Sequence, residues 1–483
     1  MAGIKKNFIY SSAYQILLVL TPVITTPYLS RVIGSEGNGV FTYTQSITNY
    51  FVLFAVLGMT NYGVRAIAEC GDDRARRSDV FWNAFAMNGL VGVGVVVAYA
   101  IFVMLFGMDN LLIWLIWGLW ILGSITDVSW LFFGVQEFRT PTIRNFITRL
   151  GAVAFIFLFV RDAGDVWAYV AAISGSFAVN SILIWPFVGR YVDFVRPTWC
   201  KMLAHLKPNL VLFVPTLATS LYLLLNKVML GFMSDMSQTG LYDYAEKISK
   251  MPLAVITALG SVVLPKMSEV ISAGRIEEGK RLVSSTMWFM MACAFALMFG
   301  IMGIAPEFVP IFFGAGYEEC VPLMSILSIV IPLICVTNVI GIQYLLPCHR
   351  DRDFTLSVCF GAVVNLVLNL FLIPAAGAMG AAVATVAAEF AVLVFQCVVV
   401  RGELDLRGVA LGALPFGVIG AAMFALMRVV AALLGGRVVS VVGLGIEFCV
   451  AAAFFLALAF GWCIATKNES FAKVFPRLAP WVR

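Results

Sequence analysis

Long apolar stretches separated by short polar loops recur along the whole chain. Each stretch is close to the roughly 20 residues that a helix needs to cross a bilayer. Charged residues and glycines punctuate the stretches, which favours helices over the alternating pattern of a β-barrel. The sequence therefore predicts an all-α polytopic membrane protein with about fourteen spans. They lie at about 7–31, 40–66, 80–106, 110–135, 141–161, 165–189, 209–233, 239–266, 283–306, 321–346, 354–374, 377–400, 408–432 and 438–465.

The composition agrees with this pattern. Of the 483 residues, 61% are hydrophobic and 12% are charged, and the mean hydropathy is +0.96. Soluble proteins carry about 25% charged residues. Most of the ten cysteines fall in apolar runs or in loops assigned to the cytoplasm, so no disulfide framework is expected. The two histidines lie in loops, and no metal or haem site is expected.

The distribution of Lys and Arg predicts the orientation. Basic residues gather at the N-terminus, in loops 2–3, 4–5, 6–7, 8–9, 10–11 and 12–13, and in the C-terminal tail. The opposite set of loops holds Arg31, Arg161 and Arg437. Because loops rich in positive charge stay in the cytoplasm, both termini are expected there. The protein is predicted to be a multi-pass membrane protein.

An internal repeat suggests two lobes. Residues 240–248 align with residues 39–47 at an offset of 201, with the Gly, an aromatic residue, a Tyr and the Ile recurring. Duplications of this kind build two-lobed transporters, although chance similarity between apolar helices is the alternative. Six spans per lobe would give both lobes the same topology, related by a pseudo-twofold axis along the membrane normal. The predicted domains are 1–200, 201–402, and two additional helices with a tail in 403–483.

Three lysines lie inside predicted spans. Lys227 falls in span 7, and Lys247 and Lys250 fall three apart on one face of span 8. A cation near the bilayer centre costs roughly 2.5–3.5 kcal/mol, so such residues usually face a wet cavity. We therefore predict an anion site at these lysines. The alternative is that Lys247 and Lys250 form structural salt bridges with Asp243 and Glu246.

Other polar residues in the spans are candidates for the same cavity. Thr42, Gln45 and Asn49 form a polar face on span 2 that suits either sugar contacts or helix-to-helix hydrogen bonds. In span 5, Arg144 lies near the end, where its side chain can reach the membrane surface. Arg149 lies deeper and is the better cavity candidate.

Two acids are candidates for ion coupling. Asp127 lies beside Trp130 at the end of span 4, where it is either a proton or ion site or the partner of an arginine in span 5. Glu389 lies in the middle of span 12, where protonation would remove the cost of burying its charge. A structural hydrogen bond is the alternative for Glu389. No cofactor is expected, apart from possible coupling to protons or sodium ions.

Enzyme motifs are missing. Residues 274–280 read G-x-x-x-x-G-K, but Arg281 replaces the Ser or Thr that would hold magnesium, and no buried strand precedes the motif. We expect neither an ATPase nor another enzyme, and no nucleic-acid partner.

Four groups of residues along the chain form recognisable motifs. They are Pro27–Gly34 with Gly39 and Tyr43–Ile47, Asp127–Trp130 with Gly134, Tyr242 with Ala245–Ile248, and Gln343–Pro347 with Asn365, Asn369, Pro374, Gly377, Gly380–Ala382 and Glu389. On these motifs the sequence resembles bacterial Wzx-type oligosaccharide flippases, in the polysaccharide transporter branch of the multidrug/oligosaccharidyl-lipid/polysaccharide exporter superfamily. The resemblance covers most of the first 400 residues and implies a location in a bacterial cytoplasmic (inner) membrane. One departure is Asn226 before Lys227, where the family has an Asp.

The resemblance implies a flippase that moves a polyprenyl-diphosphate-linked oligosaccharide from the cytoplasmic to the outer leaflet by alternating access. The lysines would hold the diphosphate, and the face with Thr42 would meet the sugars. Precursors of peptidoglycan or teichoic acid are rival substrates. A drug/cation antiporter of the same superfamily and a non-transporting scaffold of a glycan-assembly complex are alternative functions. A monomer is expected, with a polymerase and glycosyltransferases of the same pathway as possible partners.

Overall fold

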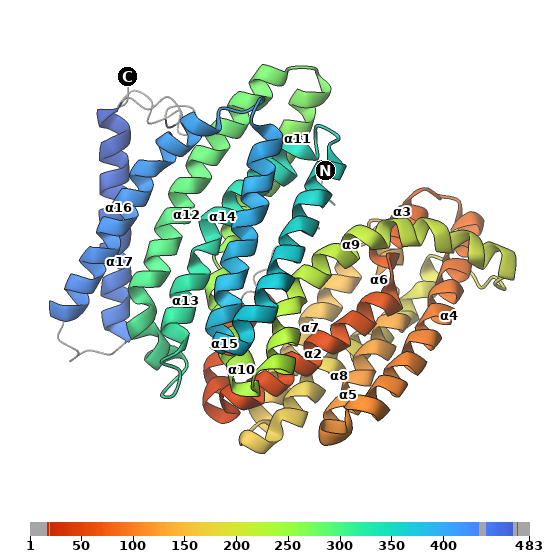
Figure 1. Cartoon of the computed structure of the whole chain (residues 1–483). Helices are drawn as coiled ribbons and strands as arrows, with labels where there is room; N and C mark the ends of the chain where they lie inside the picture. Colours follow the sequence, from red (N-terminus) through yellow and green to blue (C-terminus); the bar gives the residue numbers. More distant parts are fainter. Residues whose placement is uncertain (1–16, 19, 434–440, 467–470, 472–483) are drawn as a thin grey trace. The chain divides into compact units, whose positions relative to one another are not determined.

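The structure is a computed structural model that describes residues 17, 18, 20–433, 441–466 and 471. The described chain is helical almost throughout (Figure 1). It forms two compact units, Met1–Gly240 and Leu241–Arg483. The start of the first predicted span and both termini lie outside the described residues. The domain boundary predicted between residues 200 and 201 comes from the sequence repeat and stays a prediction.

The first unit begins with helical residues 20–32 and is built of helices joined by short loops. Its α-helices are α2 (Gly34–Val56), α3 (Met59–Ala68), α4 (Arg74–Phe106), α5 (Leu111–Thr126), α6 (Ser129–Gly134), α7 (Arg139–Phe159), α8 (Val166–Ile182) and α9 (Trp199–Met233). Three short 3-10 helices join them: η1 (Met108–Asn110), η2 (Ala163–Asp165) and η3 (Trp185–Arg190). Helix α10 (Met236–Lys250) begins in the first unit and ends in the second.

The second unit is also helical. Its elements are α11 (Leu253–Ser272), α12 (Ile276–Phe312), α13 (Cys320–Ser328), α14 (Val330–Asn338), the π-helix η4 (Val339–Leu345), α15 (Asp351–Val400), α16 (Leu406–Leu433) and α17 (Val441–Ala465). Helix α15 is a hairpin, because Gly377 has a φ of 52° that interrupts it. Its two halves run antiparallel: Gln396 donates to the Ser357 hydroxyl, and Gly361 lies against Val392.

The all-helical membrane class is confirmed. Within the described residues, ten helical segments are long and apolar enough to cross a membrane. One of them, Asp351–Val400, contains the two predicted spans 11 and 12 on either side of Gly377. The total of fourteen spans and the pseudo-twofold relation of the lobes stay predictions.

The helices of predicted spans 2 and 4 are each interrupted, and the short helices after the two interruptions lie side by side. Helix α2 ends before Leu57, whose φ is 47°, and α5 ends before Asp127, whose backbone is extended. The short helices that follow, α3 and α6, pack closely, because a Cβ on Gly63 would lie 2.7 Å from the Trp130 ring. Helix breaks leave backbone carbonyls and amides without partners in the helix, and such breaks are tolerated in a membrane where they line a cavity.

Helix α2 and the start of α10 touch at two glycines. A Cβ on Gly39 would lie 1.6 Å from the carbonyl oxygen of Met236, and a Cβ on Gly240 would lie 1.9 Å from that of Ser35. Ser35 and Met236 each precede the glycine of their own helix by four residues, so the contact is reciprocal. The hydroxyls of Ser35 and Ser237 are 2.7 Å apart beside it. The two glycines that align in the repeat thus meet where no side chain fits.

A polar clasp joins the start of α4 to the segment after η3. The Arg74 guanidinium donates two 2.7 Å hydrogen bonds to the Asp193 carboxylate, and Ser78 accepts from the Asp193 amide at 2.9 Å. Further along, the Thr198 amide donates to the Asn83 side chain. Loops 2–3 and 6–7 therefore lie on the same face, as the distribution of basic residues predicts.

An ion pair near the end of α16 joins it to α12. Arg428 on α16 donates to both carboxylate oxygens of Glu307 on α12, at 3.0 and 2.8 Å. It also donates to the Gly303 carbonyl. Helix α12 packs against both α16 and α17, so it can supply an acid between them.

Candidate functional site

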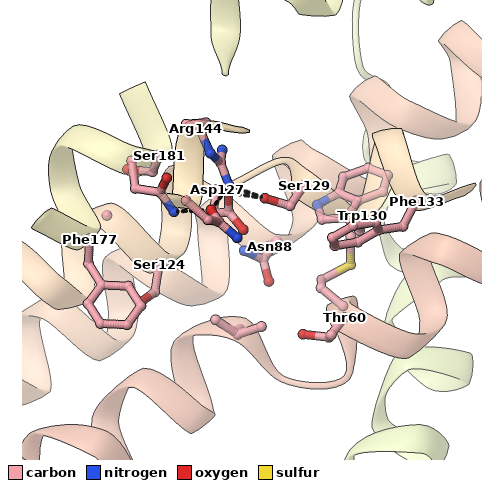
Figure 2. A pocket seen from close by; sticks show the side chains of 15 residues that line it. Thr60, Asn88, Ser124, Asp127, Ser129, Trp130, Phe133, Arg144, Phe177 and Ser181 are labelled. Carbon is pink, nitrogen blue, oxygen red and sulfur yellow. Dashed lines mark hydrogen bonds and ion pairs between the residues drawn. The ribbon is translucent and has the colours of Figure 1, made fainter. Parts of the chain in front are cut away.

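The broken spans of the first unit enclose a polar cavity of about 280 Å³. It lies where α2 meets α3 and α5 meets α6, and α4, α7 and α8 complete its wall. Figure 2 shows the polar side chains that line it. They are Thr60, Asn88, Ser124, Asp127, Ser129, Arg144, Asn145, Asn180 and Ser181.

Arg144 organises one side of this cavity. Its guanidinium donates to the Ser129 hydroxyl at 2.8 Å, to the Asn145 side chain at 3.1 Å and to the Asp127 carboxylate at 3.4 Å. Ser129 in turn donates to Asp127 at 2.6 Å. The Arg144 side chain is only 6% exposed, whereas that of Asp127 is 38% exposed. The arginine is thus a buried anchor, and the carboxylate is the group that a small molecule in the cavity can reach (Figure 2).

This geometry corrects the expected environment of Arg144. Arg144 does not extend to the membrane surface, because the break at Asp127 turns Ser129 and Asp127 toward it. The arginine of span 5 that pairs with Asp127 is therefore Arg144. Arg149 lies half-buried in a small cavity next to the polar cavity, together with Ser176 and Asn180.

Side-chain amides complete the polar cavity. Asn180 donates to the Asn145 side-chain oxygen at 2.8 Å, and Thr148 donates to Asn180 at 3.3 Å. With its amide oriented as its neighbours require, Asn88 donates to the carbonyls of Ala55 and Val56 at the end of α2. These asparagines were missed in the sequence, although an Asn in the middle of a span is itself a signal of a polar interior.

The cavity supplies oxygen and amide groups rather than a metal cage. Asp127 is its one lining carboxylate, and no group of three His, Cys, Asp or Glu residues that could hold a metal ion occurs in the part of the chain that the structure describes. The charge of Asp127 is partly neutralised by Arg144. Such a site suits a proton, a partly hydrated monovalent ion or a sugar hydroxyl.

The lysines of α10 belong to ion pairs. Lys247 lies 2.5 Å from Asp243 and Lys250 lies 2.7 Å from Glu246, each one turn away on the same helix. The acids are only 2% and 9% exposed, whereas the lysine side chains are 33% and 27% exposed. Each pair therefore has its carboxylate inside and its ammonium group near the surface. This is the arrangement expected of the structural alternative, and it leaves the ammonium groups accessible to an anion.

A hydrogen-bonded chain links α10 to the second half of α15. The Tyr242 hydroxyl lies 3.0 Å from that of Thr385 and 3.5 Å from the Glu246 carboxylate. Glu389 is buried and lies one turn after Thr385, so both residues occupy the same face of α15. Buried Asn365 and Asn369, in the first half of α15, are joined at 3.0 Å.

The remaining predicted residues lie on α2 and α9. Thr42 is buried, and Gln45, Asn49 and Lys227 are half-buried. Elsewhere on α2, the Thr44 hydroxyl accepts a hydrogen bond from Trp117 of α5 at 2.9 Å. Roles for Lys227 and for the face with Thr42, Gln45 and Asn49 stay predictions.

Comparison with known proteins identifies relatives along most of the chain. The profile of the family described as "Polysaccharide biosynthesis protein" matches residues 4–271. The chain is 24% identical over 411 residues to the "Putative O-antigen transporter" of Escherichia coli K12, which covers 83% of this chain and 97% of that protein. It is 24% identical over 248 residues to the "Probable low-salt glycan biosynthesis flippase Agl15" of Haloferax volcanii, 51% of this chain and 52% of that one.

A solved structure shares the fold. The lipid II flippase MurJ in an inward closed conformation superposes with a TM-score of 0.75 at 13% identity, covering 95% of this chain and 98% of that one.

Proposed function

The chain belongs to the polysaccharide biosynthesis protein family, and on that premise we propose that it is a flippase for a polyprenyl-diphosphate-linked oligosaccharide. It would move this lipid from the cytoplasmic to the outer leaflet by alternating access. The observation that carries the proposal is the match along 97% of a relative described as an O-antigen transporter. The family and the named relatives are transporters and flippases, not enzymes.

The charges on α10 fit a diphosphate. A diphosphate cannot cross hydrocarbon without groups that replace its water, and ammonium groups do so by charge-assisted hydrogen bonds. Lys247 and Lys250 present their ammonium groups near the surface, while a buried acid pairs with each ammonium group from the inner side. In the proposal these lysines and Lys227 bind the diphosphate, and Thr42, Gln45, Asn49 and Arg149 meet the sugars. The interior-negative potential favours outward movement by about 2.3 kcal/mol per charge per 100 mV.

Asp127 and Glu389 are the proposed ion-coupling groups. Asp127 faces a cavity large enough for several water molecules, and Glu389 shares a helix face with Thr385, which bonds to α10. A change in the charge of Asp127 would alter its hydrogen bonds with Ser129 and Arg144. A change in the charge of Glu389 would act next to the hydrogen bond between Thr385 and Tyr242. A proton and a sodium ion both fit this role.

A reconstituted assay tests the function. Full-length protein in proteoliposomes should move a fluorescent undecaprenyl-diphosphate-linked oligosaccharide between leaflets, as read by quenching from outside. Asp127→Asn and Glu389→Gln should keep substrate binding but lose the dependence on an imposed ion gradient. Absence of translocation in wild-type vesicles, under any gradient, would contradict the proposal and favour a scaffold.

The other candidates give different results in the same assay. A drug/cation antiporter would move an organic cation instead. It would need free acids in its cavity, whereas Asp127, Asp243 and Glu246 are paired with basic residues. Lipid-linked precursors of peptidoglycan or teichoic acid, offered in place of the oligosaccharide, would identify the glycan. The proposed location is a bacterial cytoplasmic membrane, where a monomer would work beside a polymerase and glycosyltransferases.

A further inference from the structure

A further cavity of the first unit opens beside α7 and η3, apart from the polar cavity and from the small cavity that contains Arg149. It has a volume of about 540 Å³. Its head is formed by Arg139 and Arg190, and its walls by Ile143, Ile147, Leu183 and Phe187. We call it the α7–η3 groove. Arg144 lies between the groove and the polar cavity, and its guanidinium is turned toward Asp127 and Ser129.

The head of the groove is positively charged. Arg139 and Arg190 are both exposed, and the Arg190 guanidinium lies 4.9 Å from the centre of the Phe187 ring. The backbone of Arg190 is fixed, because its carbonyl accepts a hydrogen bond from Arg74 in the clasp. The nearby acid, Glu137, accepts hydrogen bonds from the amide and hydroxyl of Thr140 at the start of α7. The two exposed arginines therefore outnumber the single acid at this end.

The walls of the groove are apolar and uncovered. Ile143, Ile147 and Leu183 are exposed, and Ile147 reaches 60%. Ile143 and Ile147 follow Arg139 at intervals of four residues, so they form one row along α7. At 1.5 Å per residue the row extends about 12 Å from the charged head into the apolar zone. A positively charged end that continues into an apolar groove is the arrangement expected of a site for an anionic phospholipid.

We propose that the α7–η3 groove binds an anionic phospholipid of the leaflet that faces the basic loops. Arg139 and Arg190 would hold the phosphate of the headgroup, and an acyl chain would lie against Ile143, Ile147 and Leu183. Basic pockets between helices on the cytoplasmic side are typical sites of anionic lipids. The groove is too small for a lipid-linked oligosaccharide, so it is assigned to a resident lipid and not to the transported one. The inference is independent of the proposed function.

Native mass spectrometry of the full-length protein tests this site. Palmitoyl-oleoyl phosphatidylglycerol should bind more tightly than phosphatidylethanolamine with the same chains. The double variant Arg139→Gln/Arg190→Gln should weaken phosphatidylglycerol binding roughly tenfold, because two charges near the headgroup are lost. Ile147→Trp, which fills the trough and leaves the charge unchanged, should also weaken it. Arg196→Gln is the matched control, because Arg196 is exposed in the same connecting segment but does not line the groove.

Three results would overturn the proposal. One is an equal loss of binding in Arg196→Gln, which would indicate diffuse attraction to a basic surface. Another is equal binding of phosphatidylethanolamine. The third is displacement of phosphatidylglycerol by undecaprenyl diphosphate, which would assign the groove to the route of the transported lipid. If the double variant fails to fold, Arg190→Gln alone and Ile147→Trp carry the same test.

Discussion

The ammonium group of Lys250 donates a 2.7 Å hydrogen bond to the Glu246 carboxylate, and only the acid of this pair is buried. The lysine therefore stabilises a buried charge and also presents its own charge at the surface. These two roles predict different effects of removing each partner, so they can be separated by mutation.

Charge-paired variants of α10 separate the roles. Lys250→Gln should lower stability by about 3 kcal/mol, because it leaves Glu246 buried without a counter-charge. The double variant Glu246→Gln/Lys250→Gln should recover most of that stability but no flipping, if Lys250 binds the diphosphate. Stability is read from thermal melts and flipping from the proteoliposome assay.

The matched control is the exposed pair Lys266–Glu269, whose double glutamine variant should change neither readout. Full flipping by Glu246→Gln/Lys250→Gln would mean that Lys250 is structural and does not bind the anion.

The glycine contact predicts a large effect of one methyl group. Gly39→Ala and Gly240→Ala would each place a Cβ within 2 Å of a backbone oxygen, which no side-chain movement relieves. We expect a loss of about 3 kcal/mol or failure to fold. Gly94→Ala on α4 is the control, because a Cβ there meets nothing within 4 Å. Thermal melts of the three variants decide the point, and equal melting temperatures would contradict the close approach.

His205 predicts loss of stability in acid. Burial lowers the pKa of His205 below its ordinary value of 6.5, although nearby Asp79 opposes the shift, and Tyr62 bonds to its Nδ1 atom. The folded protein therefore takes up this proton less readily than the unfolded chain. The neutral histidine contributes its stability above about pH 6.5, and that contribution is lost as the pH falls toward the folded pKa.

The melting temperature should thus fall between pH 7.5 and pH 5.5, and it should fall less in His205→Gln. His349→Gln, at an exposed histidine, should behave as the wild type. An identical pH profile in all three proteins would exclude a role for His205.

Thiol labelling tests the orientation. Cys200 is exposed in a segment assigned to the cytoplasm, so a membrane-impermeant maleimide should label it in inverted vesicles and not in intact cells. Cys70 is a poor reporter, because it is buried and burial raises the pKa of its thiol. Cys320 is buried as well. Asp109→Cys in a Cys200→Ser background should react in intact cells, and the opposite pattern would invert the topology.

Hydropathy predicted the helices well, because each apolar run has the length that a bilayer demands. The sequence also offered, as alternatives, the pairing of Asp127 with an arginine of span 5 and the pairing of Lys247 and Lys250 with acids one turn away. It left the Arg144 side chain able to reach the membrane surface, whereas that side chain is buried, because apolar runs do not reveal where a helix breaks. The asparagines of the polar cavity were missed for a related reason. Asn88, Asn145 and Asn180 lie on three different helices, and only the packing of those helices brings them together.

The clasp between Arg74 and Asp193 has a consequence for biosynthesis. The two residues are 119 positions apart, so Arg74 emerges from the ribosome long before its partner. At about 5–20 residues per second, the interval is roughly 6–24 seconds. During that time α4 through α8 enter the membrane with one end of the bundle open. Synthesis of Asp193 then allows the clasp to join the start of α4 to the segment after η3, so a nascent chain stalled before this residue should remain sensitive to proteases at its cytoplasmic loops.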